Sequence, residues 1–469
     1  MNRTPILLLA GIAIIPAGCT MAPKYARPDA PVPAGWPQGV AYQDNQSAMG
    51  APPARDLAWQ EFFSDRKLKQ LIGISLQNNR DLRLAALNVD RARALYGIQR
   101  AELLPAVDVA ASGSRAQVPG DLSGTGRRET VESYRADLGV LSWEVDFFGR
   151  IRSLKDRALQ EYFATGEARR AAQILLVASV ANGYLTLATD REKLALAERT
   201  LVAQEDAYNL VKRRHELGLA TDIDLFRAQT PVDTSRREVV RFQQIVALDR
   251  NGLDLLLGCP APANLLPADL GGVRPPRTIS PGMSSEVLLH RPDVRQAEHM
   301  LKAANADIGA ARAAFFPRIS LTATAGTASA ELTSLFKHGS DTWAFAPQAV
   351  MPVFDARVWS ALKASKAQQK IAVTQYEKAI QDAFREVADA LAVRGTIDRE
   401  LAAQESLVKA VGETYRLAQS RYAKGIDSYL DVLDAQRQLY VAEQVLVSLR
   451  LAELASRVRL YAVLGGGGE

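Results

Sequence analysis

Residues 81–105 read DLRLAALNVDRARALYGIQRAELLP, and residues 293–317 read DVRQAEHMLKAANADIGAARAAFFP. The two segments align without a gap, and an aspartate, a glycine, an arginine and a proline coincide in both copies. Further on, residues 210–229 align with residues 417–436, again with a glycine, an aspartate and an Ala-Gln pair at matching positions. The chain is therefore largely one structural unit present twice, far longer than the repeats of solenoid proteins, which span about 20–50 residues.

Composition describes an ordered protein with a polar surface. Of the 469 residues, 48% are hydrophobic and 23% are charged, which is typical of folded proteins. The net charge of +5 would permit nucleic-acid binding, but lysine and arginine are interleaved with aspartate and glutamate along the helical stretches. Because no basic stripe with interleaved aromatic residues stands out, composition argues against a nucleic-acid partner.

The N-terminus has the pattern of an export signal. Residues 1–18 combine Arg3 with a short apolar run and small residues directly before Cys19, which predicts a signal peptide. This arrangement resembles a bacterial lipoprotein cleavage site and implies that Cys19 becomes the lipidated first residue. The alternative is an ordinary cleaved signal with an incidental cysteine. Residues 19–58, with seven prolines between 23 and 53, are expected to form the lipid anchor and an extended linker.

The first repeat, residues 59–259, changes from a helical to a strand pattern. Apolar residues recur at helical spacing from 65 to 103, and Pro105 ends the predicted helix. Apolar and polar residues then alternate in two runs, and the phase of the second run changes near Val140, which indicates a bulge. A proline-rich connection, residues 260–292, leads to the second repeat.

The second repeat, residues 293–464, follows the same plan, and residues 465–469 are expected to form a flexible tail. Each repeat thus predicts a helix, two strands and a long helical hairpin. The four strands are expected at about 105–117, 131–147, 317–327 and 342–354.

The hairpins begin with two proline-free segments, residues 150–217 and 357–424. At about 1.5 Å per residue, a continuous helix of that length extends roughly 100 Å, which no compact globular domain needs. Each segment ends at a tip that contains glycine and is followed by a returning helix with a seven-residue apolar period, which predicts coiled-coil packing. Pro231 is present only in the first return and is expected to bend that helix near Arg227.

Four amphipathic strands from one chain cannot close a β-barrel, and an open strand edge in lipid leaves backbone groups unsatisfied at several kcal/mol each. Membrane insertion would therefore need several copies to share one barrel. A soluble sheet packed on helices would explain the alternation equally well, but the export signal and the long hairpins favour the membrane. The aromatic residues near the strand ends, which suit an interfacial girdle, are Trp143, Phe147, Phe148, Phe315, Phe316, Trp343, Phe345 and Phe354.

Five stretches of the chain are distinctive. They are RPDVRQAEHMLKAANADIGAARAAFFPRISLT (291–322), DFFGRIR (146–152), YEKAIQDAFREVADALA (376–392), SYLDVLDAQRQLYVAEQ (428–444) and YAVLGGGG (461–468). With these motifs, the chain from about Trp59 to its C-terminus resembles the TolC superfamily of outer-membrane factors, and within it the OprM-type efflux lipoproteins.

The resemblance implies a mainly α-helical homotrimer in which each chain supplies four strands to a 12-stranded outer-membrane β-barrel above an α-helical periplasmic tunnel. It also implies a lipid anchor in the bacterial outer membrane, a periplasmic membrane-fusion adaptor, and an inner-membrane pump of the resistance-nodulation-division type. The implied function is a passive exit duct for small amphipathic toxicants or antibiotics.

The same resemblance implies a periplasmic gate at the second hairpin tip. Asp431 and Asp434 share a helix face and match the family's periplasmic constriction, while Leu430, Asp434 and Arg437 match the leucine, aspartate and arginine of the OprM-type gate. In a threefold assembly the aspartates would form a ring of carboxylates that repels anions and attracts cations. Alternatively, Asp431 and Arg437 only interact with the helix dipole and with their neighbours.

The first hairpin offers candidate gate partners, Asp222, Asp224 and Arg227. The two tip loops correspond to the family's adaptor-docking ends, although any tight helix turn also needs glycine. The docking residues implied in this way are Gly218, Leu219, Ala220, Thr221, Gly425, Ile426 and Asp427.

Sequence patterns of catalysis are missing. The chain has no Walker-A loop, no HExxH and no GxSxG, and its four histidines lack the spacing of metal ligands. We therefore expect no enzyme activity, no metal site and no cofactor. Two alternatives to drug efflux stay open: an outer-membrane component of type I protein secretion or metal export, and a lipid-anchored periplasmic coiled-coil scaffold or adaptor.

Overall fold

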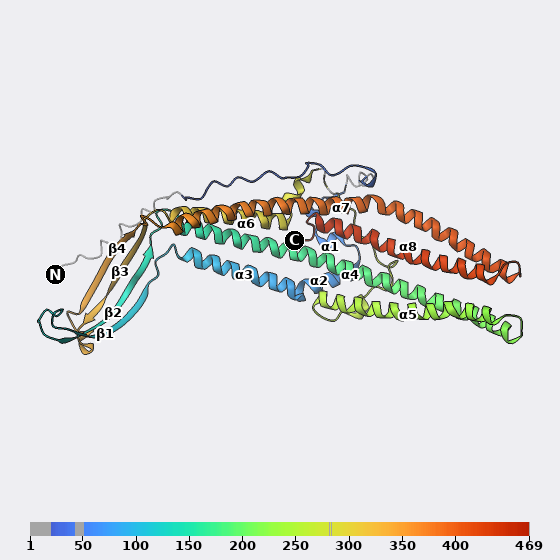
Figure 1. Ribbon diagram of the computed structural model, residues 1–469, viewed down its shortest axis with the longest axis horizontal. Coiled ribbons are helices and arrows are strands. Elements are labelled where there is room, and N and C mark those ends of the chain that lie inside the picture. The colour runs from blue at the N-terminus through green and yellow to red at the C-terminus, as the bar shows by residue number, and fades with distance from the viewer. Residues whose placement is uncertain (1–19, 43–50, 281, 283, 469) are drawn as a thin grey trace. The chain divides into compact units, whose positions relative to one another are not determined.

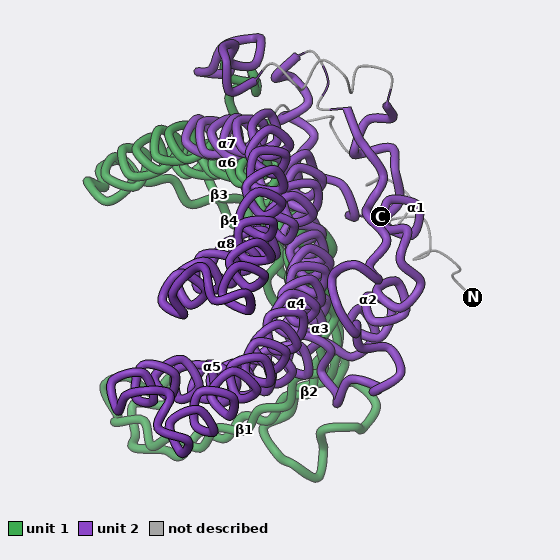
Figure 2. The backbone as a smooth tube through the Cα atoms, turned by 90° about the vertical axis from the view of Figure 1, so that its right-hand side faces the viewer, with its two compact units in different colours: residues 1–29, 88–165, 296–376 green, residues 30–87, 166–295, 377–469 purple. Residues whose placement is uncertain are grey.

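The computed structural model describes residues 20–42, 51–280, 282 and 284–468. The chain divides into two compact units that alternate along the sequence (Figure 2). Unit 1 holds the residues up to Asp29 together with 88–165 and 296–376, and unit 2 holds the remainder.

Unit 1 contains a four-stranded antiparallel sheet whose strands lie in sequence order (Figure 1). The strands lie close to the positions predicted from the alternating sequence pattern. The fourth strand was predicted to extend to Phe354 but ends earlier, at Val350. The strands are β1 Asp108–Val118, β2 Glu129–Glu144, β3 Arg318–Ser329 and β4 Asp341–Val350.

Pairing of β2 with β3 joins the two sequence repeats, because β2 belongs to the first copy and β3 to the second. The compact units therefore differ from the repeat-based division into residues 59–259 and 293–464. Each unit takes equivalent parts of both copies. The strands of both copies fall into one compact unit because they are hydrogen-bonded in one sheet.

The outer strands of the sheet have open edges within the described chain, because β1 pairs only with β2 and β4 only with β3. Side chains on both faces of β1 and β4 are largely exposed, and Val109 and Trp343 are about four-fifths exposed, at 78% and 80%. A soluble antiparallel sheet normally buries one face. In the described part of unit 1, no residue of these four strands is buried on either face, which argues against a soluble sheet packed on helices.

The bulge predicted near Val140 is present. The register between β2 and β3 shifts between Val140 and Trp143. Directly before the shift, Gly139 has a φ of 156°, and a Cβ at this position would collide with the carbonyl oxygen of Ala323. Glycine is needed here because it alone tolerates both the backbone angle and the close approach of β3.

Long helices follow the strands, as the proline-free segments predict. α4 Arg150–Glu216 has 67 residues and α7 Ala356–Ala423 has 68, and each passes from unit 1 into unit 2. The returning helices are α5 Asp222–Leu257, which continues through Pro231, and α8 Tyr429–Val463. One stretch of α4 is long and apolar enough to cross a membrane, but half of it is buried inside the fold, as in the core helix of a soluble protein.

The single helix expected from 65 to 103 is wrong, because the chain forms α2 Arg66–Asn78 and α3 Arg80–Ala101 instead. Asn79 separates them. Its side-chain oxygen accepts the backbone N–H of Leu82 at 2.9 Å, and its amide nitrogen donates to a carbonyl of α5 at 3.0 Å. Asparagine is among the preferred residues at a helix N-terminus, so the sequence carried a signal for this break.

The core of unit 2 is built around Tyr461. Its ring stacks on Phe62, at the end of α1 Trp59–Phe62, with 3.9 Å between ring centroids. The Tyr461 hydroxyl donates to the carbonyl of Leu57 at 2.6 Å. The shorter elements that complete the fold are α6 Pro292–Ala313 and the 3-10 helices η2 Ala54–Asp56, η3 Ala263–Leu265, η4 Ser285–His290 and η5 Leu332–Ser334.

The glycines after α8, expected to form a flexible tail, instead pack into this core. Gly466 and Gly467 are buried, and a Cβ on Gly466 would collide with the ring of Tyr461. The amide of Gln173 donates to the carbonyl of Gly467 at 3.1 Å. The absence of side chains thus allows close packing here.

Residues 20–42, expected to be part of an extended linker, are extended but held in place. In unit 1, Glu298 of α6 accepts hydrogen bonds from Arg27 Nη2 at 2.9 Å and from the Tyr25 hydroxyl at 3.0 Å. We call residues 20–42 the N-terminal strap. Cys19, expected to carry the lipid, directly precedes the strap and lies outside the described residues.

Candidate gate at the hairpin tips

Each hairpin of unit 2 turns through a short loop that contains a left-handed glycine. Gly218, between α4 and α5, has a φ of 72°, and its N–H donates to the carbonyl of His215 at 2.8 Å. Gly425, between α7 and α8, has the same φ of 72°, and its N–H donates to the carbonyl of Tyr422 at 2.9 Å. Glycine ends helices in this conformation at little steric cost. The two copies therefore share one turn geometry.

A capping arrangement starts each returning helix. At α5, the carboxylate of Asp224 accepts the backbone N–H of Thr221 at 3.0 Å, and the Thr221 hydroxyl accepts the N–H of Asp224 at 3.3 Å. At α8, the Asp431 carboxylate accepts the backbone N–H of Ser428 at 3.1 Å and its hydroxyl at 2.7 Å. Two of the proposed gate carboxylates thus also stabilise helix starts, which supports the reading of Asp431 as a helix-start charge.

These caps lower the pKa of the Asp224 carboxyl, mainly through the hydrogen bond from the Thr221 backbone. The positive charge of Arg227 adds to this effect. The pattern of Thr or Ser followed three residues later by an acidic residue is a known sign of a helix start, and it is visible in the sequence. From the sequence, Asp431 was interpreted as a gate residue or a helix-start charge, whereas Asp224 was interpreted only as a candidate gate partner.

An exposed ion pair lies one turn further into α8. Arg437 Nη2 approaches Asp434 Oδ1 at 2.6 Å, and the amide of Gln438 donates to Asp434 Oδ2 at 2.7 Å. Leu430 is exposed on the same end of the helix. An exposed ion pair contributes only about 0–1 kcal/mol, so this pair can exchange partners at little cost.

The first hairpin has its own side-chain hydrogen bond at the tip. His215 Nε2 lies 2.7 Å from Asp222 Oδ1, so that the end of α4 is linked to the start of α5. Asp222 is thereby engaged within its own hairpin and not with Asp434 or Arg437.

Two side-chain pairs at the tips were not anticipated from the sequence. Arg421 holds both carboxylate oxygens of Asp427, at 2.5 and 2.8 Å, and this hydrogen bonding lowers the pKa of Asp427. Arg214 Nη1 donates to the Tyr422 hydroxyl at 2.9 Å and links the two hairpins. The pair of Arg214 and Tyr422 depends on which helices become neighbours in space, and local spacing does not predict that.

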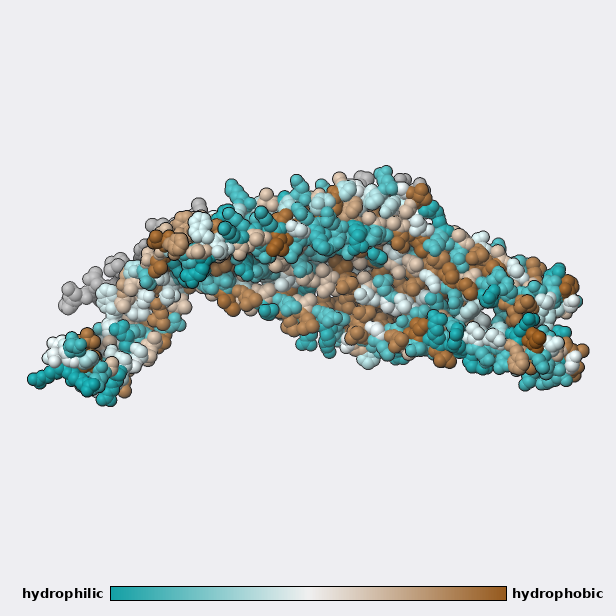
Figure 3. Space-filling view, in the orientation of Figure 1, coloured by the Kyte–Doolittle hydropathy of each residue, from teal (hydrophilic) through white to brown (hydrophobic). Residues whose placement is uncertain are grey.

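Large apolar side chains surround these polar groups and stay on the surface. In the space-filling view, brown residues appear at the ends of both hairpins (Figure 3). A soluble helix end rarely gathers so many exposed apolar residues without a partner. The exposed apolar residues of the two tips are Leu217, Leu219, Ile223, Phe226, Ile426 and Leu430.

A metal centre has no support in the geometry. Across the residues that the structure describes, no three or more His, Cys, Asp and Glu side chains gather closely enough to hold a metal ion.

The model of the family "Outer membrane efflux protein" matches residues 71–259 and 283–466 of the chain. The chain belongs to the outer membrane efflux protein family. Both sequence repeats lie within the match. The expected resemblance to outer-membrane factors is therefore confirmed, as are the fold class and the location in the outer membrane.

Relatives and solved structures agree along nearly the whole chain. The probable efflux pump outer membrane protein TtgC of Pseudomonas putida is 49% identical and the match covers 98% of this chain and 95% of TtgC. Outer membrane protein OprJ of Pseudomonas aeruginosa is 43% identical, with 97% and 94% covered. The open state of the Neisseria gonorrhoeae MtrE outer membrane channel is 38% identical with a TM-score of 0.86, over 96% and 99% of the chains.

Proposed function

We propose that three copies of this chain form the outer-membrane exit duct of a tripartite efflux system. The observation that carries the proposal is the pair of open edges on β1 and β4 in a sheet with no covered apolar face. In lipid, each unpaired backbone group costs several kcal/mol, and contact of β1 in one copy with β4 in the next satisfies both edges. Three copies with four strands each then close a 12-stranded barrel.

The tips of the hairpins are proposed to meet the periplasmic adaptor, which links the duct to an inner-membrane pump of the resistance-nodulation-division type. Exposed Leu219 and Ile426 support this proposal, because apolar side chains on a loop favour burial in a partner. The neighbouring docking residues are proposed to be Gly218, Ala220, Thr221, Gly425 and Asp427.

The gate is proposed to consist of Leu430, Asp431, Asp434 and Arg437, with Asp222, Asp224 and Arg227 as partners from the first hairpin. Around a threefold axis, the exposed Asp434–Arg437 pair would be repeated three times, and arginine could lock neighbouring carboxylates until the adaptor separates the tips. The weakness of the exposed pair supports this role, because a gate must exchange its contacts at low cost.

The cargo is proposed to be small amphipathic toxicants, including aromatic solvents and antibiotics. Two Pseudomonas putida relatives that are 49% identical are named for this kind of cargo, a toluene efflux pump outer membrane protein and an antibiotic efflux pump outer membrane protein. Because both names describe exit of small molecules, they favour drug efflux over type I protein secretion or metal export.

One experiment separates the duct from a lipid-anchored periplasmic scaffold. We expect the full-length Cys19→Ala protein to stay in outer membranes after alkaline carbonate extraction, because the barrel holds it without the lipid. Purified wild-type protein should show a trimer mass by native mass spectrometry and should conduct ions in planar bilayers. Release of the Cys19→Ala protein into the soluble fraction as a non-conducting monomer would overturn the proposal.

A further inference from the structure

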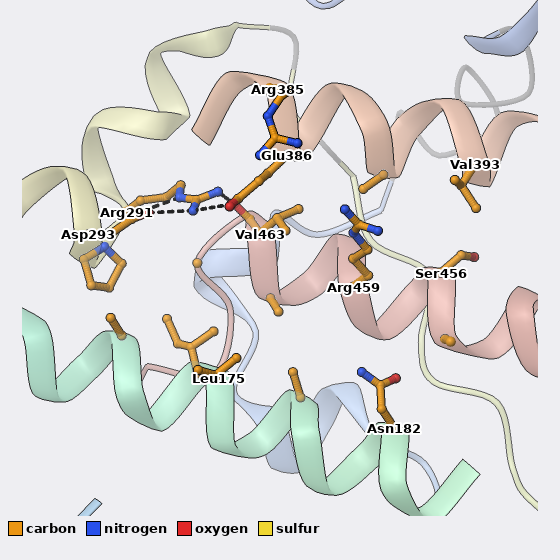
Figure 4. A pocket seen from close by; sticks show the side chains of 18 of the residues that line it. Leu175, Asn182, Arg291, Asp293, Arg385, Glu386, Val393, Ser456, Arg459 and Val463 are labelled. Carbon is orange, nitrogen blue, oxygen red and sulfur yellow. Dashed lines mark hydrogen bonds and ion pairs between the residues drawn. The ribbon is translucent and has the colours of Figure 1, made fainter. Parts of the chain in front are cut away.

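Unit 2 contains a cavity of about 780 Å³ between α4, α7 and α8 (Figure 4). This volume lies within the range of about 300–1,000 Å³ that is typical of small-molecule sites. Leu175 of α4, Val393 of α7 and Leu451 of α8 supply apolar walls, and alanines on all three helices leave the space open. Leu175 and Val393 are exposed, so part of this apolar wall faces solvent.

The arginine at one end of the cavity is already fully engaged. Arg291, which is buried, donates to Asp293 at 2.7 and 3.0 Å, to Glu386 at 2.7 Å and to the carbonyl of Val463 at 2.7 Å. Arg385, further along the rim, pairs with Asp389 at 3.2 Å. These charges are compensated inside the protein and form part of the wall.

Two other polar groups of the cavity lack such compensation. Arg459 of α8 lines the cavity at its solvent-exposed edge, and no carboxylate lies within ion-pair distance of it in the described part of the chain. Asn182 of α4 carries a buried side-chain oxygen without a hydrogen-bond partner. Figure 4 shows Asn182 projecting from α4 toward α8, and Arg459 projecting from α8. A buried polar atom without a partner is uncommon and calls for a ligand or water.

The cavity opens on the same side of α8 as the proposed gate. Steps of three and four residues, which keep one helix face, lead from Asp434 and Arg437 along the helix to Arg459. The intervening positions of this face are exposed or half-buried, namely Val441, Val445, Ser448, Ala452 and Ala455. If Asp434 and Arg437 face the duct, the cavity faces it too.

We propose that this cavity is a binding site for amphipathic organic anions inside the duct. The inference rests on the proposed function. Apolar walls take up the hydrocarbon part of the molecule, the Arg459 guanidinium binds its carboxylate or sulfonate, and Asn182 completes the polar contacts. The positive charge of the exposed Arg459 side chain favours an anion over a cation, because a cation would be repelled by the guanidinium. The chain therefore contributes a selectivity of its own instead of acting only as a passive conduit.

The test uses full-length trimers in lipid nanodiscs and the probe 5-(dimethylamino)naphthalene-1-sulfonate, titrated by calorimetry with empty nanodiscs subtracted. We expect saturable binding to the wild type and about tenfold weaker binding to Arg459→Ala, because a charge-assisted hydrogen bond is lost. Arg459→Lys should retain part of the affinity. The uncharged sulfonamide analogue should bind the wild type and Arg459→Ala equally.

Two further variants make the result specific. Ala455→Trp fills the cavity without touching a charge and should abolish binding of both probes. Arg450→Ala removes an exposed arginine from the opposite side of α8 and should bind like the wild type. Equal binding of the sulfonate to the wild type, Arg459→Ala and Ala455→Trp would overturn the proposal. The proposal would also be overturned if the wild type shows no saturable binding, for example because a neighbouring copy covers the cavity. The calorimetry does not depend on conduction, so a non-conducting trimer that binds the probe would count against the duct alone.

Discussion

Asp249 of α5 is a half-buried carboxyl that lies next to a second carboxyl, Asp190 of α4. Burial, followed by the negative charge of Asp190 and a hydrogen bond to it, raises the pKa of Asp249 to about 6. Lys193 Nζ lies 3.8 Å from Asp190 Oδ1. One oxygen of Asp249 is buried without a partner. At the residue scale, protonation of Asp249 below about pH 6 removes the repulsion between two carboxylates where α4 packs on α5.

A pH dependence of stability follows from this pair. Because the pKa of Asp249 is higher in the folded than in the unfolded chain, the stabilisation is complete below about pH 4 and is lost as the pH rises through about 6. Asp249→Asn keeps the position neutral, so we expect its thermal midpoint to exceed that of the wild type by about 2 °C at pH 7.5 and the gain to shrink toward pH 5. Differential scanning fluorimetry measures this. Asp233→Asn, at an exposed position of the same helix, serves as the control. An equal gain in thermal midpoint at both pH values would contradict the raised pKa of Asp249.

At the scale of single elements, the N-terminal strap and the hairpin tips show how local chemistry positions long segments. The strap is held by Glu298, whose pKa would be raised by burial but is lowered overall by hydrogen bonds from Lys302, Arg27 and Tyr25. The tips are held by caps, by glycine turns and by exposed ion pairs. Both elements therefore depend on a few charge-assisted hydrogen bonds, and single substitutions can test them.

Release of the strap is expected for Glu298→Ala. The substitution leaves Arg27 and Lys302 without their partner, and because both cations are partly exposed to water it should cost about 1–2 kcal/mol. We expect trypsin to cut after Lys24 several times faster than in the wild type, as followed by mass spectrometry of the peptides; the bond after Arg27 precedes Pro28 and resists trypsin. Glu286→Gln, an exposed site, provides the comparison. Unchanged cleavage would mean that other contacts of the strap suffice.

Opening of the gate is expected when the exposed pair of α8 is removed. Asp434→Ala combined with Arg437→Ala should raise single-channel conductance in planar bilayers, because the lock between neighbouring copies is lost. Asp431→Ala removes a cap as well as a carboxylate and should cost about 1 kcal/mol of stability. Its matched control is Asp224→Ala, which removes the corresponding cap of the first hairpin.

The outcomes of these variants separate gating from capping. If Asp431→Ala changes conductance no more than Asp224→Ala does, Asp431 acts as a cap alone. If the double variant of Asp434 and Arg437 conducts like the wild type, that pair does not belong to the gate.

At the scale of the whole molecule, β2–β3 pairing joins the strand pairs of the two sequence repeats into one four-stranded sheet. Gly326 of β3 lies opposite Asp137 of β2, where a Cβ would collide with the carbonyl oxygen of Ala136. A barrel shared among copies needs this sheet intact in every chain.

Loss of trimer is accordingly expected for Gly326→Val. The added side chain separates β2 from β3, so each copy would offer a distorted sheet to its neighbours. Native mass spectrometry should show less trimer and more monomer than in the wild type. Gly124→Ala lies in a loop with open space around it and should assemble normally. A normal trimer fraction with Gly326→Val would show that the close approach is not needed for assembly.

The sequence by itself determined the elements, because periodicity is a local property. Long hairpins could be predicted from the absence of proline over 150–217 and 357–424 and from the seven-residue apolar period of the returning helices. The strands could be predicted from the change to a two-residue period, and the bulge near Val140 from the shift in its phase. The break at Asn79 and the cap at Asp224 were also readable as local signals, but they were missed, and the helix-start role of Asp431 was considered only as an alternative.

The tertiary structure alone decided which distant residues meet. Arg27 with Glu298, Gly466 with Tyr461, and Asp190 with Asp249 are far apart in the sequence or on different helices, and no spacing rule pairs them. The strap and the C-terminal glycines lacked periodicity and so were expected to be loose, yet buried hydrogen bonds and close packing hold them. Their order depends on surfaces that exist only after the helices have packed, and for that physical reason it could not be predicted from the chain alone.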